Sequence, residues 1–473
     1  MPENVNRKIK IQFITRGFPL AYYFGSCIYL QDFVGYLQQL GFKIELVSLN
    51  APTTARGIFI IPSAFKKLSF SVKDNIRIGR FLLQSRAGLA WITILPWLIY
   101  NLLPNSFQRI IQSINKSVKQ RLLQRKSETV NTGKKAQIQV EQDVFPTPEE
   151  IAFAKEQFVR FQPDVVIANY TCLANLLDAI PDEAALKVIL THDIQHQRVT
   201  SFQQAGVDLD RSNWNWDLES AQLQKAQVLL AIQQEDARVL KEMAPNCEVI
   251  YMPMSGISHS HTVNQVPGRC LFVGSRSPHN VHGLEWFLEN VWSSVVRSVP
   301  TCSLHICGNI CTQIQGAFPN VDLLGEVDNL EPEYSAAEVC LVPLLAGSGL
   351  KIKLVEAMSY GRACVSTSVG VQGVPEIAGK TTLVADTAED FAAAVRTLLT
   401  NADKRQWMEE QARKYVTEKL SPQAAYQPFV DRIKQHLQQV ANKNNKQSLD
   451  NSLSSNKVLT SNLMPNKEKS HEI

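Results

Sequence analysis

The chain has 473 residues, of which 45% are hydrophobic and 19% charged, with 22 Gly and 22 Pro. That length allows two or three domains with proper cores, and the composition excludes collagen, a coiled-coil rod, a small disulfide scaffold and a wholly disordered chain. The first ten residues are polar and lead directly into a strand-like stretch, so secretion is not expected.

Charge is unevenly distributed along the chain. The formal net charge is +4, from 48 Lys and Arg residues and 44 Asp and Glu residues. The basic block, Arg56–Lys135, contains 15 basic and two acidic residues, a net +13, so the rest of the chain carries −9. Such a block indicates an anionic partner, such as a membrane surface, a phosphorylated substrate or nucleic acid.

The first half of the chain alternates strand-like and helical segments, which indicates a parallel α/β sheet. The pattern predicts a strand at Ile9–Thr15, a helix at Ile28–Leu40 and a second strand at Ile44–Leu49. After the basic block, further strands are predicted at Val165–Ala168, Val188–Leu190, Val228–Ile232 and Val249–Met252. These segments define an N-terminal domain at residues 1–254.

A second α/β unit is predicted at residues 255–421. Its strands are expected at Cys270–Val273, Ser303–Cys307, Val339–Pro343 and Ala363–Ser366, and its helices at Val281–Val296, Leu350–Tyr360 and within Ala388–Lys419. Another helix is predicted at residues 422–441. The segment 442–473 is rich in Asn, Ser and Lys without apolar periodicity and is predicted to be a disordered tail.

The alternation breaks within an insertion at about residues 56–135. An uncharged run at Ala87–Gln108 contains Trp91 and Trp97, but a helix there would rise only about 22 Å, short of a hydrocarbon core of about 30 Å, and Pro96 interrupts it. We therefore favour a peripheral segment on an anionic membrane over a spanning helix. The alternative is a helix packed on the sheet with a solvated basic face.

The nine cysteines are scattered without a C-x-x-C spacing, which fits a reducing cytosol. Cys307 and Cys311 lie near His305, but no second ligand pair follows at zinc-finger spacing. No metal site and a cytoplasmic location are therefore expected.

The densest chemical signal is the segment Leu341–Gly373, in which a strand, a Gly-Ser-Gly turn and a helix follow one another. The N–H groups of a first helical turn lack intrahelical acceptors and can bind a phosphate. Gly347 and Gly349 permit close backbone approach, and Lys351 or Lys353 can neutralise the charge.

Glu356 lies on the same, largely apolar helix, where an unpaired carboxylate would be costly. It is seven residues beyond Gly349, about 10.5 Å along the axis, which is close to the separation between a diphosphate and its nucleoside ribose. A carboxylate that accepts hydrogen bonds from the ribose hydroxyls is favoured over a structural ion pair.

Residues 347–358, Gly-Ser-Gly-Leu-Lys-Ile-Lys-Leu-Val-Glu-Ala-Met, resemble the donor-binding signature of family 4 glycosyltransferases with the GT-B fold (glycosyl transferases group 1). Further matches lie at residues 163–170, 191–193, 271–275 and 278–281. The resemblance implies two Rossmann-like domains with parallel sheets facing a central cleft. It also implies transfer of a hexose from a nucleoside-diphosphate (NDP) sugar to a glycan or lipid-linked acceptor, with retention of configuration and no obligatory metal or other cofactor.

The resemblance also implies the donor-binding residues. Glu356 would bind the ribose, and the backbone of Gly347–Leu350 would hold the diphosphate. The expected donor-side residues are Gly274, Arg276, Gly347, Ser348, Gly349, Leu350, Lys351 and Glu356.

On the acceptor side, the resemblance places His192 near the reacting carbon of the donor sugar. Gly25 and Ser26 would lie where the first glycine-rich loop approaches phosphate or acceptor. Asp193 is a catalytic base, as in an inverting variant, or a cap of the loop that positions His192, and we favour the cap.

The sequence departs from the family pattern in two places. Ser348 stands where the family often has a glutamate that contacts the donor sugar, so the identity of the sugar does not carry over. Ser275 and His279 stand near the usual Arg and Lys positions, and we expect Arg276 and Lys351 to neutralise the phosphate instead.

Other interpretations remain open. Asp208-Leu209-Asp210 has the D-x-D spacing of metal-dependent transferases, but no apolar strand precedes it. A sugar-nucleotide epimerase shares the architecture, and an inactive nucleotide-sugar-binding scaffold would fit Ser348. Nucleic-acid binding is not expected, because no recognisable module accompanies the basic block. The favoured interpretation is a polysaccharide-biosynthesis glycosyltransferase, cytoplasmic and peripheral on the inner face of the membrane.

Overall fold

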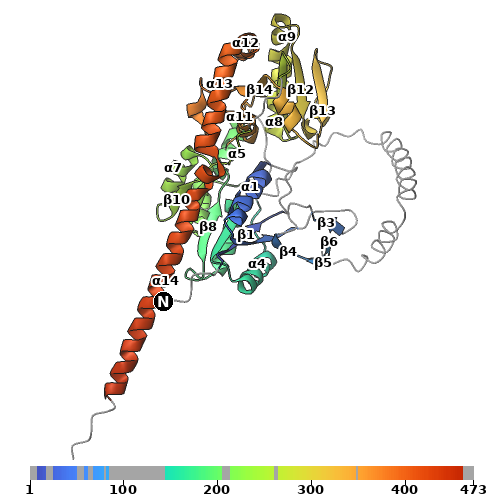
Figure 1. The fold of residues 1–473 in the computed structure, drawn as a ribbon. Coiled ribbons are helices and arrows are strands. Elements are labelled where there is room, and N and C mark those ends of the chain that lie inside the picture. The colour runs from blue at the N-terminus through green and yellow to red at the C-terminus, as the bar shows by residue number, and fades with distance from the viewer. Residues whose placement is uncertain are drawn as a thin grey trace, which may run out of the picture.

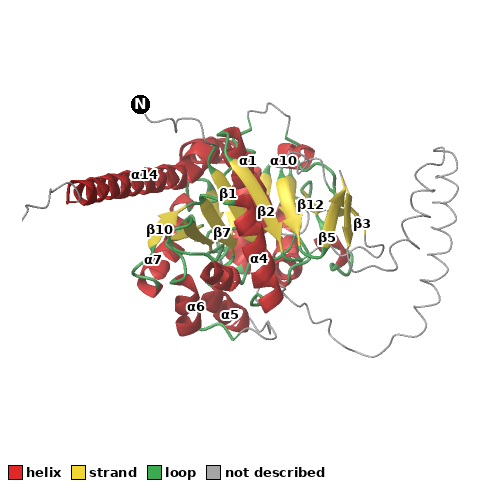
Figure 2. Ribbon diagram, turned by 90° about the horizontal axis from the view of Figure 1, so that it is seen from below, coloured by secondary structure: helices red, strands yellow, loops and turns green. Residues whose placement is uncertain are grey.

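The computed structural model describes residues 8–17, 25–50, 58–61, 68–78, 81–84, 144–204, 213–259, 265–347 and 350–461. Within these residues, two parallel β-sheets form the centres of two domains, with helices packed around them (Figure 1, Figure 2). The predicted α/β class with two Rossmann-like domains is confirmed.

The N-terminal domain contains a seven-stranded parallel sheet in the order β10-β9-β8-β7-β1-β2-β4. Its strands are β1 (Lys10–Thr15), β2 (Lys43–Ser48), β4 (Ser69–Val72), β7 (Val165–Asn169), β8 (Leu186–Leu190), β9 (Val228–Ala231) and β10 (Glu248–Tyr251). Every residue of β7, β8 and β9 is buried, because helices cover both faces of a central parallel sheet. This burial explains why these strands are nearly continuous apolar runs.

The helices of this domain are α1 (Gly25–Gln39), α4 (Pro148–Phe161), α5 (Gln195–Gln204), α6 (Trp216–Leu223) and α7 (Gln234–Met243), with the 3-10 segment η3 (Thr171–Ala179). A capping box formed by Thr147 and Glu150 begins α4. Arg16, after β1, donates two hydrogen bonds to the Glu150 carboxylate at 2.7 and 2.8 Å. The start of α4 is thereby fixed to the carboxyl end of the sheet.

Part of the basic block belongs to the N-terminal domain. The strand β4 pairs in parallel with β2, while β3 (Ile58–Ile60), β5 (Asn75–Ile78) and β6 (Phe81–Gln84) form a small antiparallel sheet. Within the described residues, these short strands follow one another in place of the alternation of strands and helices. The sequence does not predict them as strands. The tryptophan-bearing run 87–108 lies outside the described residues.

The C-terminal domain contains a six-stranded parallel sheet in the order β13-β12-β11-β14-β15-β16. Its strands are β11 (Arg269–Val273), β12 (Ser303–Cys307), β13 (Val321–Gly325), β14 (Val339–Val342), β15 (Ala363–Ser366) and β16 (Thr382–Val384). Its main helices are α8 (Pro278–Phe287), α9 (Ser293–Ser298), α10 (Glu331–Ala336), α11 (Ile352–Ser359), α12 (Ala388–Thr400) and α13 (Ala402–Tyr415). Short helical segments are η4 (Leu288–Trp292), η5 (Asn309–Thr312), η6 (Pro375–Ile377) and η7 (Val416–Leu420).

The last helix, α14 (Pro422–Ser461), returns to the N-terminal domain. Tyr426, Phe429 and Ile433 are fully buried in the same core cluster as Phe13 and Phe33 of β1 and α1. In Figure 1 the second half of α14 runs on past this domain. The prediction of a disordered tail is wrong for residues 442–461, because no Pro or Gly interrupts the sequence there and an established helix extends more easily than it nucleates. Residues 462–473 lie outside the described part.

None of the helices in the described ranges is long and apolar enough to cross a bilayer.

Candidate functional site between the two domains

The carboxyl ends of the two sheets face each other. The N–H of Gly347, after β14, donates to the Ser201 Oγ on α5 at 3.4 Å. Gly373, after β15, packs so closely on Gln233, after β9, that a Cβ on it would lie 2.9 Å from Gln233 Oε1. Because ligands of parallel α/β sheets bind outside the carboxyl ends of the strands, this junction is the candidate site.

Helix α11 begins at Ile352, with Lys351 as its N-cap, two residues later than predicted. Leu350 therefore lies in the preceding loop, and the N–H groups that begin the helix are those from Ile352 onward. Gly347 has a φ of +130°, a conformation that favours glycine. Ser348 and Gly349 lie outside the described residues, so their predicted contact with the diphosphate stays a prediction.

Lys351 is buried at the start of α11. Its Nζ lies 3.4 Å from Gln372 Oε1 and would be 3.7 Å from a Cβ on Gly347. Burial lowers the pKa of Lys351 to about 8, although Asp193 and Asp236 act in the opposite direction. The predicted cation is thus next to the glycine turn.

Lys353 lies beside Gly274, at the end of the first strand of the C-terminal domain. Its Nζ donates to Asn280 Oδ1 at 2.6 Å, lies 4.3 Å from the Phe272 ring centroid and would be 3.5 Å from a Cβ on Gly274. Burial lowers the pKa of Lys353 to about 7. Arg276 is exposed, and its backbone N–H donates to a side chain outside the site. The cation beside Gly274 is therefore Lys353, which the sequence alone does not separate from Lys351.

Glu356 lies one turn into α11, next to a tyrosine from another helix. The Tyr334 hydroxyl donates to Glu356 Oε2 at 2.9 Å. Burial raises the pKa of Glu356, whereas the Tyr334 hydrogen bond and the Lys353 charge lower it. A neutral hydroxyl orients the carboxylate without cancelling its charge, so Glu356 can still bind a ligand. No motif in the sequence identifies Tyr334.

His192 follows β8 in the N-terminal domain with a φ of +59° and is 8% exposed. Its Nε2 lies 2.7 Å from Asn169 Oδ1, and the Tyr170 ring is 4.4 Å away. Burial lowers the pKa of His192 to about 3, so the ring is neutral at physiological pH. The amide oxygen beside Nε2 favours the tautomer that carries the proton there. The sequence identifies His192 but not the function of Asn169.

Asp193 contacts helix α5. Its Oδ2 lies 3.4 Å from Arg198 Nη1, and its Oδ1 accepts from Gln195 Nε2 at 3.3 Å. Both contacts are to side chains of α5, whereas the backbone N–H groups of Gln195 and His196 at the start of α5 donate to Glu219, so the interpretation of Asp193 as a cap stays a prediction.

Gly25 is the first residue of α1, and the Ser26 side chain forms a hydrogen bond with Tyr170. The start of α1 is thus connected to the ring that packs on His192.

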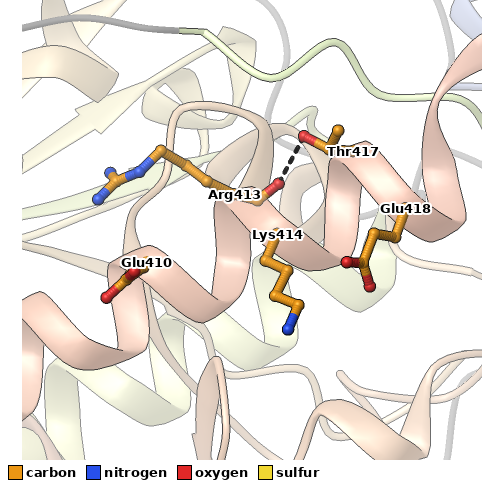
Figure 3. A pocket seen from close by; sticks show the side chains of 5 residues that line it. All are labelled: Glu410, Arg413, Lys414, Thr417 and Glu418. Atoms are coloured by element: carbon orange, nitrogen blue, oxygen red, sulfur yellow. Dashed lines mark hydrogen bonds between the residues drawn. The ribbon is translucent and has the colours of Figure 1, made fainter.

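Two surface depressions lie away from this junction. One, of about 290 Å³, is lined by side chains of α13 and η7: Glu410, Arg413, Lys414, Thr417 and Glu418 (Figure 3). The other, of about 670 Å³, lies along β16 and the start of α12. Neither includes a predicted site residue.

The His305 cluster is an ion-pair network in the C-terminal domain. His305 Nδ1 lies 2.7 Å from Glu333 Oε2, and its Nε2 is 3.5 Å from Asp322 Oδ2. In the part of the chain that the structure describes, no three His, Cys, Asp or Glu side chains are grouped to hold a metal ion. The Asp208–Asp210 segment is outside that part.

Comparison with known proteins finds a matching family within the C-terminal domain. Residues 267–401 match the family described as Glycosyl transferases group 1. These residues lie within the C-terminal domain. An uncharacterised 44.6 kDa protein in the cps region of Klebsiella pneumoniae is 30% identical over 134 residues, which is 26% of this chain. The chain spans 34%, or about a third, of that curated relative's length.

The similarity to solved structures extends over most of the chain. Sucrose-phosphate synthase from Thermosynechococcus elongatus has a TM-score of 0.59 at 14% identity, covering 92% of this chain and all of that one. HepE from Anabaena, solved with UDP and glucose, has a TM-score of 0.54 at 12% identity, covering 90% of this chain and all of its own.

The pneumococcal O-GlcNAc transferase GtfA, solved with UDP and GlcNAc, has a TM-score of 0.55 at 10% identity, covering 91% of this chain and all of its own. At these identities the similarity shows the fold, which is GT-B, as the resemblance implies.

Proposed function

We propose that the protein is a glycosyltransferase that moves a hexose from an NDP-sugar to a glycan or lipid-linked acceptor, with retention of configuration. The observation that carries this proposal is that Lys353 and Glu356 lie on the same helix, α11, which begins at the domain junction. A cation beside a helix N-terminus suits a diphosphate, and an oriented carboxylate one turn later suits ribose hydroxyls.

The chemistry requires stabilisation of the leaving diphosphate. The acceptor oxygen forms a bond to the anomeric carbon while the bond from that carbon to the diphosphate oxygen breaks. The acceptor proton passes to an oxygen of the leaving phosphate, so no protein carboxylate base is needed. Lys351 and Lys353 would stabilise the charge that develops on the diphosphate. His192, neutral and fixed by Asn169, would position the donor sugar.

Two features of the similar proteins support the proposal. HepE and GtfA were solved with UDP, which makes uridine nucleotides the first donors to test here. The relative in the cps region of Klebsiella pneumoniae suggests a pathway of polysaccharide biosynthesis.

The test measures thermal stabilisation of the full chain by UDP, other nucleoside diphosphates and their sugars, since ligands of the folded state raise the melting temperature. Glu356→Gln should abolish the stabilisation. The matched control is Glu376→Gln, because Glu376 also accepts a tyrosine hydrogen bond, from Tyr415, but lies outside the site. The proposal fails if no nucleotide stabilises the protein or if Glu356→Gln responds like the wild type.

A ligand that stabilises the protein is then used in a transfer assay. We expect a new glycosidic bond with the anomeric configuration of the donor, and a rate that is unchanged by excess EDTA because no obligatory metal is proposed. An epimerised sugar nucleotide formed without acceptor would contradict transferase activity.

We also propose that the basic block docks the enzyme on an anionic membrane, where a lipid-linked acceptor would lie, at the cytoplasmic face. The support is its net charge of +13. Vesicles with anionic lipid should co-sediment the protein at moderate salt, and neutral vesicles should not. Equal recovery from both would refute the membrane role.

A further inference from the structure

Asp236 is a buried carboxylate that none of the functions above uses. It lies in the first turn of α7, next to the candidate site, and is 3% exposed. Its Oδ1 accepts a 2.6 Å hydrogen bond from Gln233 Nε2. Its Oδ2 is buried and has no hydrogen-bond partner among the residues that the structure describes. A buried carboxylate oxygen without a donor is costly, and a bound ligand can remove that cost by supplying one.

The position of Asp236 relates it to both domains. Its partner Gln233 lies against Gly373, and Leu350 Cδ1 is 3.2 Å from where a Gly373 Cβ would be. Burial raises the pKa of Asp236 to about 7; the Asp193 charge also raises it, and the Lys351 charge lowers it. Through Gln233 and Gly373, Asp236 therefore lies close to the junction of the two domains.

We propose that Asp236 accepts a hydrogen bond from a hydroxyl group of the donor sugar and is a determinant of sugar specificity. This inference rests on the proposed function. The hydroxyl groups of the sugar can donate hydrogen bonds, which an ionised diphosphate cannot do. The reacting sugar would lie between His192 and Lys351.

The absent glutamate at position 348 makes this assignment specific to this chain. The family often contacts the donor sugar from that position, where this chain has serine. Asp236 would supply a carboxylate contact from the opposite domain. If it instead formed only a structural pair with Lys351, its removal would affect nucleotide binding and stability without regard to the sugar.

The experiment compares the affinities of the full chain for UDP and UDP-glucose by calorimetry; if the thermal screen selects another base, the corresponding nucleotides replace them. Asp236→Asn should leave the affinity for the nucleoside diphosphate within about twofold of wild type. It should weaken binding of the neutral NDP-sugar about 10- to 100-fold, the usual loss for a hydrogen bond to a charged group. Glu235→Gln, on the same helix with a side chain 69% exposed, is the matched control and should behave like wild type.

Deoxy analogues of the sugar provide a readout that does not depend on folding of the variant. One single-deoxy NDP-sugar should bind wild type about 10- to 100-fold more weakly, and Asp236→Asn should not distinguish it from the parent sugar. Equal weakening of the diphosphate and the NDP-sugar by Asp236→Asn overturns the inference, as does wild-type binding that no single hydroxyl affects. If wild type binds no NDP-sugar at all, the proposed function itself fails.

Discussion

The Tyr334 hydroxyl donates a 2.9 Å hydrogen bond to Glu356 Oε2, while the Tyr334 ring stacks on Tyr360 with centroids 4.8 Å apart. Tyr360 in turn stacks on His259, at 4.2 Å and an interplanar angle of 3°. His259 belongs to the segment that leads out of the N-terminal domain. The orientation of the carboxylate expected to bind ribose is thus fixed by rings that reach the connection between the domains.

Tyr334→Phe should weaken UDP binding about three- to tenfold at neutral pH, because the carboxylate loses the donor that orients it. Tyr334 and Lys353 lower the pKa of Glu356, and Asp32 of α1 raises it together with burial. Loss of the hydroxyl therefore raises this pKa further. Since the ionised carboxylate binds ribose, the loss of affinity on acidification should begin at a higher pH in the variant.

The measurement is the dissociation constant of UDP as a function of pH by calorimetry. Tyr415→Phe removes a comparable tyrosine–glutamate hydrogen bond outside the site and should leave the profile unchanged. If the affinity of Tyr334→Phe for UDP begins to fall at the same acidic pH as that of wild type, Tyr334 does not act on Glu356.

Lys353→Ala should reduce the affinity for UDP about 10- to 100-fold and affect the affinity for uridine much less, because the ammonium would act directly on the diphosphate and on the ribose only through the pKa of Glu356. The pKa of Lys353 is about 7, so in wild type the cation is lost as the pH rises through neutrality. The affinity of wild type for UDP should therefore fall as the pH rises above about 7, and the fall should be smaller in Lys353→Ala. The exposed Lys404→Ala is the control, and equal losses for UDP and uridine would exclude a phosphate contact.

Lys353→Met should raise the melting temperature at pH 6. Burial places the folded pKa, about 7, below its ordinary value of 10.5, so the unfolded chain binds more protons between these values and wild-type stability rises with pH across that window. The destabilisation caused by burying Lys353 is therefore complete below pH 7 and has disappeared above about pH 10.5. Calorimetric scans at pH 6 and pH 9 should show the larger gain at pH 6, and a loss of stability at pH 6 would be the opposite result.

His192→Ala should lower kcat about 100-fold, the usual loss for one group that acts on the reacting centre, with little change in UDP affinity. Because the pKa of His192 is about 3, the wild-type rate should show no histidine inflection between pH 5.5 and 7.5. The exposed His282→Ala serves as control. An inflection near pH 6.5 that disappears in His192→Ala would mean that the ring titrates.

Phe429→Ala should destabilise the protein by about 3–5 kcal/mol, because the ring is fully buried against Phe33 at 5.8 Å. Denaturant unfolding measures the loss, and the exposed Gln435→Ala on the same helix should cost little. A loss below 1 kcal/mol would show that α14 does not belong to the N-terminal core.

The sequence predicts the central strands and one edge strand, β10, but misses other edge strands. Strands such as β8 are buried on both faces and appear as apolar runs. By contrast, β13 and β16 are edge strands that the sequence analysis does not identify. In β13 three of five residues are exposed, including Leu323 and Leu324, so no burial pattern distinguishes the strand from a loop.

The residues of the candidate site show the same limit of prediction from sequence. Gly347, Lys351 and Glu356 are close in the chain, so local spacing identifies them. Tyr334 and Asp236 reach the site through folding, Tyr334 from 22 residues before Glu356 and Asp236 from the other domain. Their functions depend on contacts that no local pattern encodes.

The return of α14 has a consequence for how the protein is made. The N-terminal sheet is synthesised first, yet Ala425, Tyr426, Phe429, Val430 and Ile433 join its core only after the C-terminal domain has been synthesised. The nascent first half must therefore wait, with an apolar groove uncovered, while the whole second half emerges from the ribosome. Splitting the gene between the domains would leave that groove open unless the final helix were supplied in trans.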